Sequence, residues 1–239
     1  MRHNVWATGV LLLAGCGAAL AQAPGADTIA LRMQAHNAER TAALEGYQAE
    51  RVYRVHYQGT GGEHEAEMHV RLEFRAPGAK HFVIESESGS KFLCDKVLKK
   101  LVESEEEAAG KAARLQLVLS PENYNLQLVG EETWNGVPAW VLQVEPKVAD
   151  KFSHRGRVWI SKDDYGLMRV VGEPAKSPSW FLSRAAFEYR YGREGGRFWL
   201  PMQNESSSHV RIGGEATLSI EYSGYQIETV AKEVAALRR

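Results

Sequence analysis

The chain has only two cysteines, Cys16 and Cys94, among its 239 residues. Cys16 falls in an N-terminal segment that reads as a leader, so the rest of the chain has no pair of cysteines to oxidise. The net charge is −1, from 29 basic and 30 acidic residues, and no basic block is interleaved with aromatic residues. This charge pattern argues against nucleic-acid binding. Stability must come from packing, and a 44% hydrophobic composition is enough for one sizeable core.

The sequence also lacks the motifs that carry catalysis. It has no G-x-S-x-G elbow, glycine-rich phosphate loop, paired catalytic carboxylates or cysteine cluster. Residues 88–91 match the S-x-x-K of serine acyl-enzymes, but the S-D-N and K-T-G partners are missing, so we interpret the match as chance. His64 and His69 differ in strand parity, which predicts opposite faces of a sheet and no shared metal ion. Asp163 and Asp164 fit a hairpin turn. We therefore predict no enzyme, no catalytic residue, no metal site and no cofactor.

No apolar run reaches the ~20 residues that a transmembrane helix needs. The N-terminus instead has the parts of a secretory signal: Arg2 and His3, an apolar run over residues 10–13, and small residues after it. Two cleavage sites compete. Residues 13–16 (LAGC) match a bacterial lipobox, which would remove residues 1–15 and make Cys16 the lipidated first residue. Residues 19–21 (ALA) form an A-x-A site, which would remove a signal peptide of residues 1–21. The mature domain is then 22–239, and the protein is exported either free or membrane-anchored.

Beyond the leader, residues 27–46 predict a helix, with Asp27 or Thr28 as its cap and Gly46 after its last turn. Residues 65–75 alternate completely between apolar and polar side chains, which predicts a strand with one covered face and one wet face. An Asn-Gly pair at residues 135–136 predicts a tight hairpin. The same alternation recurs in about ten segments. They are residues 51–57, 65–75, 80–88, 124–133, 137–145, 156–161, 167–173, 185–191, 197–205 and 216–222.

So many antiparallel strands in one sheet favour curling into a barrel or half barrel. Bulky side chains are frequent in these segments, and any one of them is most simply a packed core residue. They are Tyr53, Tyr57, Phe74, Phe82, Trp140, Trp159, Phe187, Tyr189, Tyr191, Phe198 and Tyr222. A curled sheet that does not close leaves an apolar trough, and helices that cover it incompletely make a site for an apolar ligand. Strand parity gives the cavity residues that we expect. They are Met68, Val70, Leu72, Phe74, Phe82, Ile84, Phe187 and Tyr189.

Residues 88–102 predict a second helix, which interrupts the series of strands. Leu93, Val97 and Leu101 form one apolar stripe, flanked by Leu98 and Val102, with lysines on the opposite side. Two interpretations stay open. The segment is a surface helix docked by its stripe, followed by a solvated acidic run, or it is a lid over the mouth of the trough. Cys94 beside the stripe fits a small buried residue.

Several segments resemble the LolA-like outer-membrane lipoprotein-sorting group, within the LolA, LolB and RseB superfamily. They are GRVWISKDDYGLMRVVGEPAKSPSWF (156–181), FWLPMQNESSSHVRIGGEATLSIEYSGYQI (198–227), SGSKFLCDKVLKKLVESEEEAA from residue 88, and LQVEPK (142–147). The likeness spans nearly all of the mature chain. It implies an α+β, mainly β fold: an incomplete antiparallel β-barrel with helices over its concave apolar face.

The resemblance further implies a periplasmic carrier or receptor that binds lipoprotein acyl chains or lipids for outer-membrane lipoprotein sorting, without a cofactor. The loop at residues 173–181 is the candidate contact with a membrane or with lipoprotein-export machinery. The alternatives are an RseB-like lipoprotein-sensing regulatory module and an envelope enzyme of unknown type. The cargo and the direction of transfer do not follow from the sequence.

Overall fold

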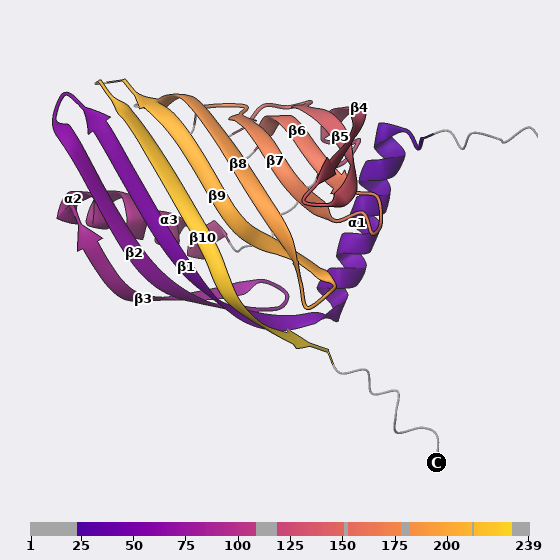
Figure 1. The fold of residues 1–239 in the computed structure, drawn as a ribbon, viewed down its shortest axis with the longest axis horizontal. Helices are drawn as coiled ribbons and strands as arrows, with labels where there is room; N and C mark the ends of the chain where they lie inside the picture. Colours follow the sequence, from indigo (N-terminus) through magenta and orange to yellow (C-terminus); the bar gives the residue numbers. More distant parts are fainter. Residues whose placement is uncertain (1–22, 109–118, 151–152, 178–181, 212, 231–239) are drawn as a thin grey trace, which may run out of the picture.

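The computed structural model describes residues 23–108, 119–150, 153–177, 182–211 and 213–230. Most of these residues belong to one ten-stranded sheet in which neighbouring strands are antiparallel (Figure 1). The alternating segments of the sequence thus correspond one for one to strands. The strands are β1 (Leu44–Gly59), β2 (Gly62–Arg75), β3 (Ala79–Gly89), β4 (Tyr124–Trp134), β5 (Val137–Pro146), β6 (His154–Ser161), β7 (Leu167–Pro174), β8 (Leu182–Glu194), β9 (Phe198–Val210) and β10 (Glu215–Thr229).

The sheet is open among the described residues. Its order is β3-β2-β1-β10-β9-β8-β7-β6-β5-β4, so that β3 and β4 form the two edges. Strands β1 and β10, which lie far apart in the sequence, pair over most of their length and occupy the third and fourth places in this order. The predicted incomplete antiparallel barrel is therefore confirmed, and full closure is not what the chain adopts.

Turn chemistry sets the register of the hairpins where the sequence predicted it. Asn135 and Gly136 between β4 and β5 both have positive φ, 48° and 78°. That conformation matches the twist of the strands in a two-residue hairpin and is accessible to Asn and Gly at little cost. Trp134 consequently pairs with Val137, and the register set by the turn holds as far as a shift between Leu128 and Gly130.

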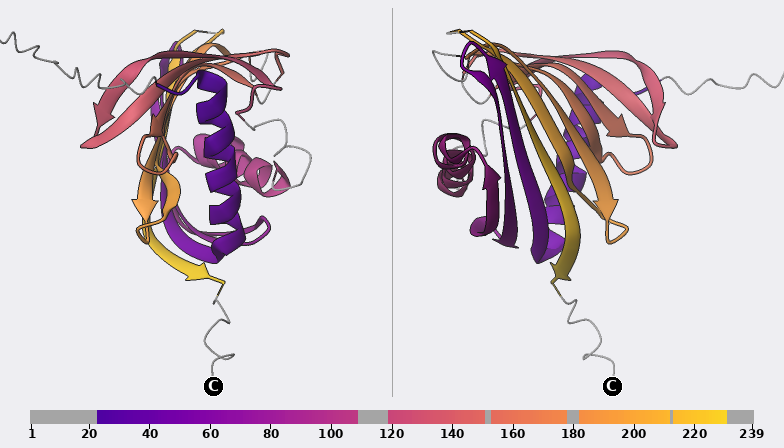
Figure 2. Two further views of the ribbon diagram at one scale, coloured as in Figure 1. Left: turned by 90° about the vertical axis from the view of Figure 1, so that its right-hand side faces the viewer. Right: turned by 60° about the vertical axis from the view of Figure 1, so that its left-hand side comes forward.

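All helices lie on the concave side of the sheet (Figure 2). Helix α1 (Ala26–Ala43) covers the half that contains β4 to β7, and the segment α2 (Lys91–Leu93), η1 (Cys94–Leu98) and α3 (Lys99–Ala108) covers the half that contains β1 to β3. The expected end of the first helix at Gly46 is wrong, because Leu44 already has extended backbone and starts β1. The expected cap is also wrong: Gly25 is the N-cap, and Asp27 lies in the first turn, where its charge favours the helix dipole.

Three apolar clusters fill the space between the helices and the sheet. The first joins Leu93, Cys94, Leu98 and Val102 of the α2–α3 segment to β1, β2 and β10. The second joins Ile29 and Met33 of α1 to β4–β7, and the third lies where α1 passes into β1. Burial of these side chains is what fixes both helical segments against the sheet.

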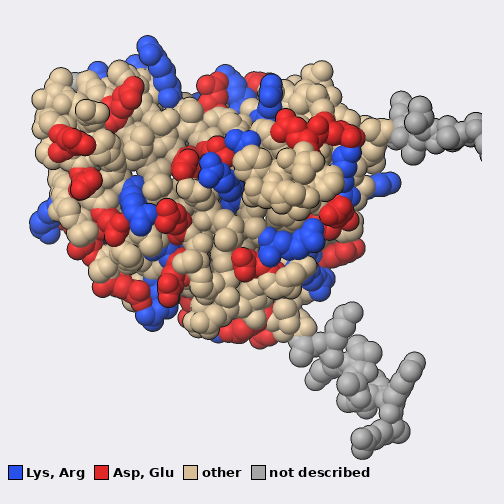
Figure 3. All heavy atoms as spheres, in the orientation of Figure 1, with Lys and Arg blue, Asp and Glu red and all other residues tan. Residues whose placement is uncertain are grey.

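The outer face carries a smaller cluster, which corrects one expectation. Trp159 packs there, with Ala139, Val141 and Met168, and it does not belong to the helix-covered face. Its indole donates to Glu132 at 2.8 Å. Elsewhere on this face basic and acidic side chains alternate across the surface (Figure 3), as the polar half of each alternating strand predicts.

Candidate functional site

An apolar band crosses the concave face from one helix-covered half to the other. Directly paired residues on adjacent strands make this row, because paired residues of antiparallel strands share a face. Only Asn204 interrupts it with a polar side chain, and that amide donates to the Tyr222 hydroxyl at 2.8 Å. The row runs Met68, Tyr53, Ile220, Asn204, Tyr189, Val170, Val158, Leu142.

The residues predicted for the cavity all lie in strands, and most pack into the clusters under the helices. Met68, Val70 and Leu72 are fully buried. Phe74 and Phe82 pack against the third cluster, where Phe74 stacks on Tyr47 at 5.0 Å. Ile84 lies on the edge strand β3, opposite Val70, and is 39% exposed.

Phe187 and Tyr189 lie in the middle of the band, on β8. Their rings stack with centroids 4.6 Å apart, and both are half-buried. They pack on the second cluster, so they extend the surface under α1 toward the half that η1 and α3 cover. These two aromatic rings therefore add apolar surface to the middle of the band.

The α2–α3 segment confirms a docked amphipathic element and corrects its phase. Leu93 is buried as expected, but Leu98 and Val102 are the buried positions that follow it, whereas Val97 and Leu101 are half-buried at the flank. The reason is a π-helical turn over Cys94–Leu98, which adds a residue to the turn and rotates the stripe. The buried thiol of Cys94 lies 3.5 Å from the Ser88 carbonyl.

A charged cluster lies between α3 and the sheet, on the apolar side. The Arg51 guanidinium, 3% exposed, donates to both carboxylate oxygens of Glu105 at 3.0 and 3.1 Å and to the Tyr53 hydroxyl at 2.9 Å. Lys80 of β3 reaches the same carboxylate at 3.2 Å. Tyr222 faces the Arg51 guanidinium with its ring centroid 4.7 Å away. Glu105 is thus the link that joins α3 to two cations of the sheet.

The pKa shifts follow from this arrangement. Burial disfavours the charge of Arg51, but Tyr53 and Glu105 outweigh burial and raise its pKa above the ordinary value. Burial also opposes the charge of Glu105, yet Arg51 and Lys80 hold the pKa of that carboxyl below its usual range. Burial raises the pKa of Tyr53 to about 12, although Arg51 acts in the opposite direction. At neutral pH Arg51 is therefore a cation, Glu105 a carboxylate and Tyr53 a neutral phenol.

The sequence pattern does not predict this pair, because Glu105 falls in an acidic run that predicts a solvated segment and Arg51 begins a predicted strand. One signal was present: Arg51 shares strand parity with Tyr53 and Tyr57, which puts a charge on the covered face. A charge on that face needs a partner, and an acidic run on the covering helix was available to supply one.

The α1 half is held differently. The carboxylate of Asp164, in the turn between β6 and β7, accepts from the indole of Trp199 at 2.9 Å and lies 3.1 Å from Arg40 of α1. Arg193 approaches it at 3.3 Å. Asp164 thus does more than shape a turn: it fastens the C-terminal half of α1 to the sheet. The N-terminal half of α1 is held by apolar contacts instead, because Ile29 and Met33 are buried among apolar side chains.

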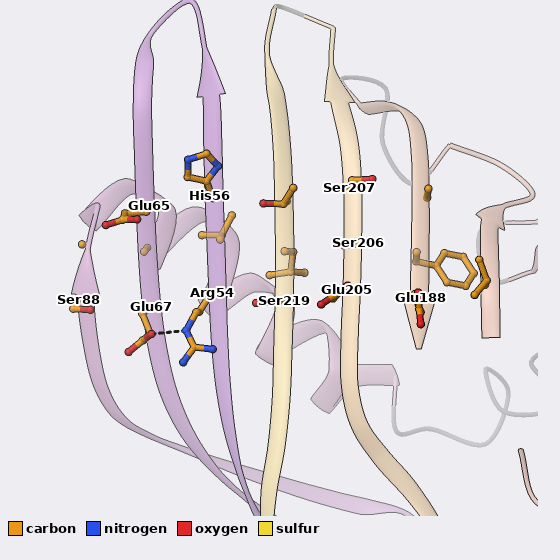
Figure 4. Close-up of a pocket in the computed structure, with 18 of the residues that line it drawn as sticks. Arg54, His56, Glu65, Glu67, Ser88, Glu188, Glu205, Ser206, Ser207 and Ser219 are labelled. Carbon is orange, nitrogen blue, oxygen red and sulfur yellow. Dashed lines mark hydrogen bonds and ion pairs between the residues drawn. The ribbon is translucent and has the colours of Figure 1, made fainter. Parts of the chain in front are cut away.

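A groove of about 830 Å³ crosses β1, β2, β3, β7, β8, β9 and β10 (Figure 4), and its lining includes Val55, Ala66, Phe187 and Leu218 beside polar residues. Its polar lining includes Arg54, Glu67, Glu188, Glu205 and Ser219. These charges largely neutralise each other, since Arg54 bonds Glu67 at 2.7 Å and Glu188 accepts from Arg169 at 2.8 Å and Arg190 at 2.7 Å. The groove thus combines carboxylates and hydroxyls with apolar side chains, whereas the band on the concave face is almost entirely apolar.

Within the described ranges, no group of His, Cys, Asp or Glu side chains is arranged to hold a metal ion. None of the helices described is long and apolar enough to span a membrane. The leader with Cys16, and Trp180 and Phe181 of the predicted contact loop, lie outside the described residues, so both expectations stay predictions.

No protein-family model matches the chain, and no curated protein matches it by sequence. Several solved bacterial structures are similar in fold. A DUF1329 family protein from Desulfovibrio piger matches with a TM-score of 0.42 and 14% identity, over 85% of this chain and 92% of that one. A domain assigned to the outer membrane lipoprotein-sorting proteins, from Vibrio parahaemolyticus, matches with a TM-score of 0.41 and 13% identity, over 87% of this chain and 95% of that one.

The structures similar to this chain include a LolA superfamily protein. It comes from Nitrosomonas europaea, with a TM-score of 0.37 and 9% identity, over 87% of this chain and 96% of that one.

Proposed function

We propose that this protein is a periplasmic carrier or receptor that holds the acyl chains of lipoproteins or lipids on the concave face of its sheet, for outer-membrane lipoprotein sorting. The observation that carries the proposal is the apolar band under two separate helical covers. An open sheet could bury this band permanently with a second sheet, but here helices cover it, and one of them is held by a charged link and a single apolar stripe.

The energetics suit reversible binding. Each CH₂ group that moves from water to the band gains about 0.8 kcal/mol, so a long acyl chain needs no polar recognition to be retained. The acyl chain competes for the band with Leu93, Leu98 and Val102, which leave the sheet when the α2–α3 segment lifts. Because both states bury apolar surface, the difference between them stays small enough for exchange with a membrane.

Displacement of a neutral apolar dye, N-phenyl-1-naphthylamine, tests the proposal. A dipalmitoylated peptide should displace the dye, whereas the same peptide without acyl chains should not. Tyr189→Asp places a charge in the band and should lower the affinity for the lipopeptide by about tenfold or more. The matched control is Arg190→Asp, the next residue of β8, which faces the outer side and pairs with Glu188; its affinity should stay near that of the unchanged protein.

Tyr189→Gln repeats the measurement without a new charge, and circular dichroism checks that each variant is folded. Equal displacement by the unacylated peptide, or a loss of affinity in Arg190→Asp that equals the loss in Tyr189→Asp, would contradict an acyl site on the concave face.

The leader decides between a soluble carrier and an anchored receptor. We expect cleavage after Ala21, because that A-x-A site follows a complete apolar run. Expressed in a Gram-negative host, the full chain should then fractionate with the soluble periplasm, and Cys16→Ser should leave its distribution unchanged. A chain that sediments with membranes and is released by Cys16→Ser would instead be a lipid-anchored receptor.

A further inference from the structure

Arg51 is a cation buried in the apolar face that we propose for acyl chains. It projects from β1 between the rings of Phe82 and Tyr222, with centroids 5.1 and 4.7 Å from the guanidinium carbon. Aromatic faces stabilise a cation but do not neutralise it. A site meant only for hydrocarbon would have no use for this charge, because burying an arginine costs free energy that an aliphatic side chain would avoid.

The only carboxylate bonded to Arg51 among the described residues comes from the cover, not from the sheet. Glu105 lies on α3, whereas Arg51 and Lys80 both lie on strands of the sheet. When the α2–α3 segment lifts, the Glu105 carboxylate leaves with it, and the two cations stay behind on the concave face. In the open state Arg51 and Lys80 therefore lack a counter-ion, and an anionic group of the ligand would supply one.

Arg51 has a spare donor for such an anion. Its Nε–H is buried and has no hydrogen-bond partner, although buried polar groups are nearly always paired. The guanidinium donates to Glu105 and Tyr53 through one terminal nitrogen, Nη1. The fork that arginines use to bind a carboxylate or phosphate with two parallel hydrogen bonds is therefore not fully used in the closed state.

We propose that Arg51, assisted by Lys80, binds the anionic head group of an acyl ligand, and that this carboxylate or phosphate takes the place of the Glu105 carboxylate when the cover lifts. The inference rests on the proposed acyl site and adds its selectivity: anionic amphiphiles over neutral ones of equal chain length. Exchange of one anion for another keeps the cluster neutralised in both states, so opening of the cover costs less free energy for a ligand that brings its own anion than for a neutral one.

The same dye displacement, at pH 8, tests this selectivity with three 12-carbon ligands: dodecanoate, dodecyl phosphate and dodecanol. We expect at least one of the two anions to bind about 10- to 100-fold more tightly than dodecanol, the range for charge-assisted hydrogen bonds. The double variant Arg51→Gln/Glu105→Gln should bring the anion-to-alcohol ratio close to one while it keeps dodecanol binding. The control Arg71→Gln/Glu85→Gln neutralises an ion pair on the outer side of β2 and β3 and should leave the ratio unchanged.

Lys80→Gln gives a second, milder variant, because Lys80 is 28% exposed and its loss leaves the Arg51–Glu105 bonds in place. It should lower the ratio severalfold without loss of folding. Equal affinities for all three ligands in the unchanged protein, or a ratio that survives in both Arg51→Gln/Glu105→Gln and Lys80→Gln, would overturn the head-group site and leave the acyl site standing. Failure of all three ligands to displace the dye would overturn the acyl site itself.

Discussion

Replacing Leu98 with aspartate is expected to detach the α2–α3 segment from the sheet while the sheet stays folded. Leu98 lies in the helical segment, and its side chain is fully buried against the first cluster, which includes Tyr53 and Met68 of the sheet. An unpaired carboxylate at this position costs several kcal/mol when it is buried and nothing when the segment is lifted. A shift of about 3 kcal/mol toward the lifted state changes its population by about 100-fold.

Cys94 reports the lifting, because this residue belongs to the same segment and is 2% exposed in the closed state. Burial also raises the pKa of the Cys94 thiol, which slows its reaction in the closed state. In a chain with Cys16→Ser, labelling of Cys94 by a thiol reagent should accelerate about 100-fold in Leu98→Asp. The control is Lys96→Asp, at an exposed position of the same π-helical turn, and its labelling rate should change little. Similar acceleration in both variants, or none in either, would show that the apolar stripe does not hold the segment.

The strands were predictable because most of them have one covered face and one wet face. Alternation at a period of two is unambiguous when one row must be apolar and the next is wet, and β2 shows this from Glu65 to Arg75. Positions where tertiary context overrides the local pattern were not predictable. In the sequence, Leu44 extends the apolar side of the predicted helix and Gly46 is its end signal. In the structure they pair instead with Thr229 and Glu228 of β10, some 180 residues away in the chain.

The candidate site was predictable in outline and not in its charges. Strand parity places Met68, Tyr189 and their neighbours on one face, and the structure brings them into one band. Which side chains of the covering helix face the sheet depends on a π-helical turn, and helical spacing of apolar residues does not predict such a turn. The pairing of Arg51 with Glu105 joins positions 54 residues apart, and it depends on where the cover lands on the sheet.

Neutralising only one member of the Arg51–Glu105 pair is expected to destabilise the protein far more than neutralising both. Arg51→Gln leaves the Glu105 carboxylate under the cover without its closest cation, which should lower the free energy of unfolding by about 3 kcal/mol. Glu105→Gln leaves Arg51 buried without an anion, at a cost of about 2 kcal/mol, since Lys80 is partly exposed and stays hydrated. The double variant should return to within about 1 kcal/mol of the unchanged protein, because no buried charge of the pair is left alone.

Urea unfolding of the four proteins gives the coupling energy directly. The control Arg71→Gln breaks an exposed ion pair with Glu85 and should cost less than about 1 kcal/mol.

The free energy of unfolding should also depend on pH through the same ion pair. Because the pKa of Glu105 is lowered in the folded protein, its contribution is complete above its unfolded pKa of about 4.3 and is lost as the pH falls through the lowered folded pKa. The double variant lacks this loss, so its stability should fall less steeply than that of the unchanged protein below pH ~4. Additive effects of the two single substitutions would mean that Arg51 and Glu105 do not act on one another, and the cover would then be held by the Leu98 stripe alone.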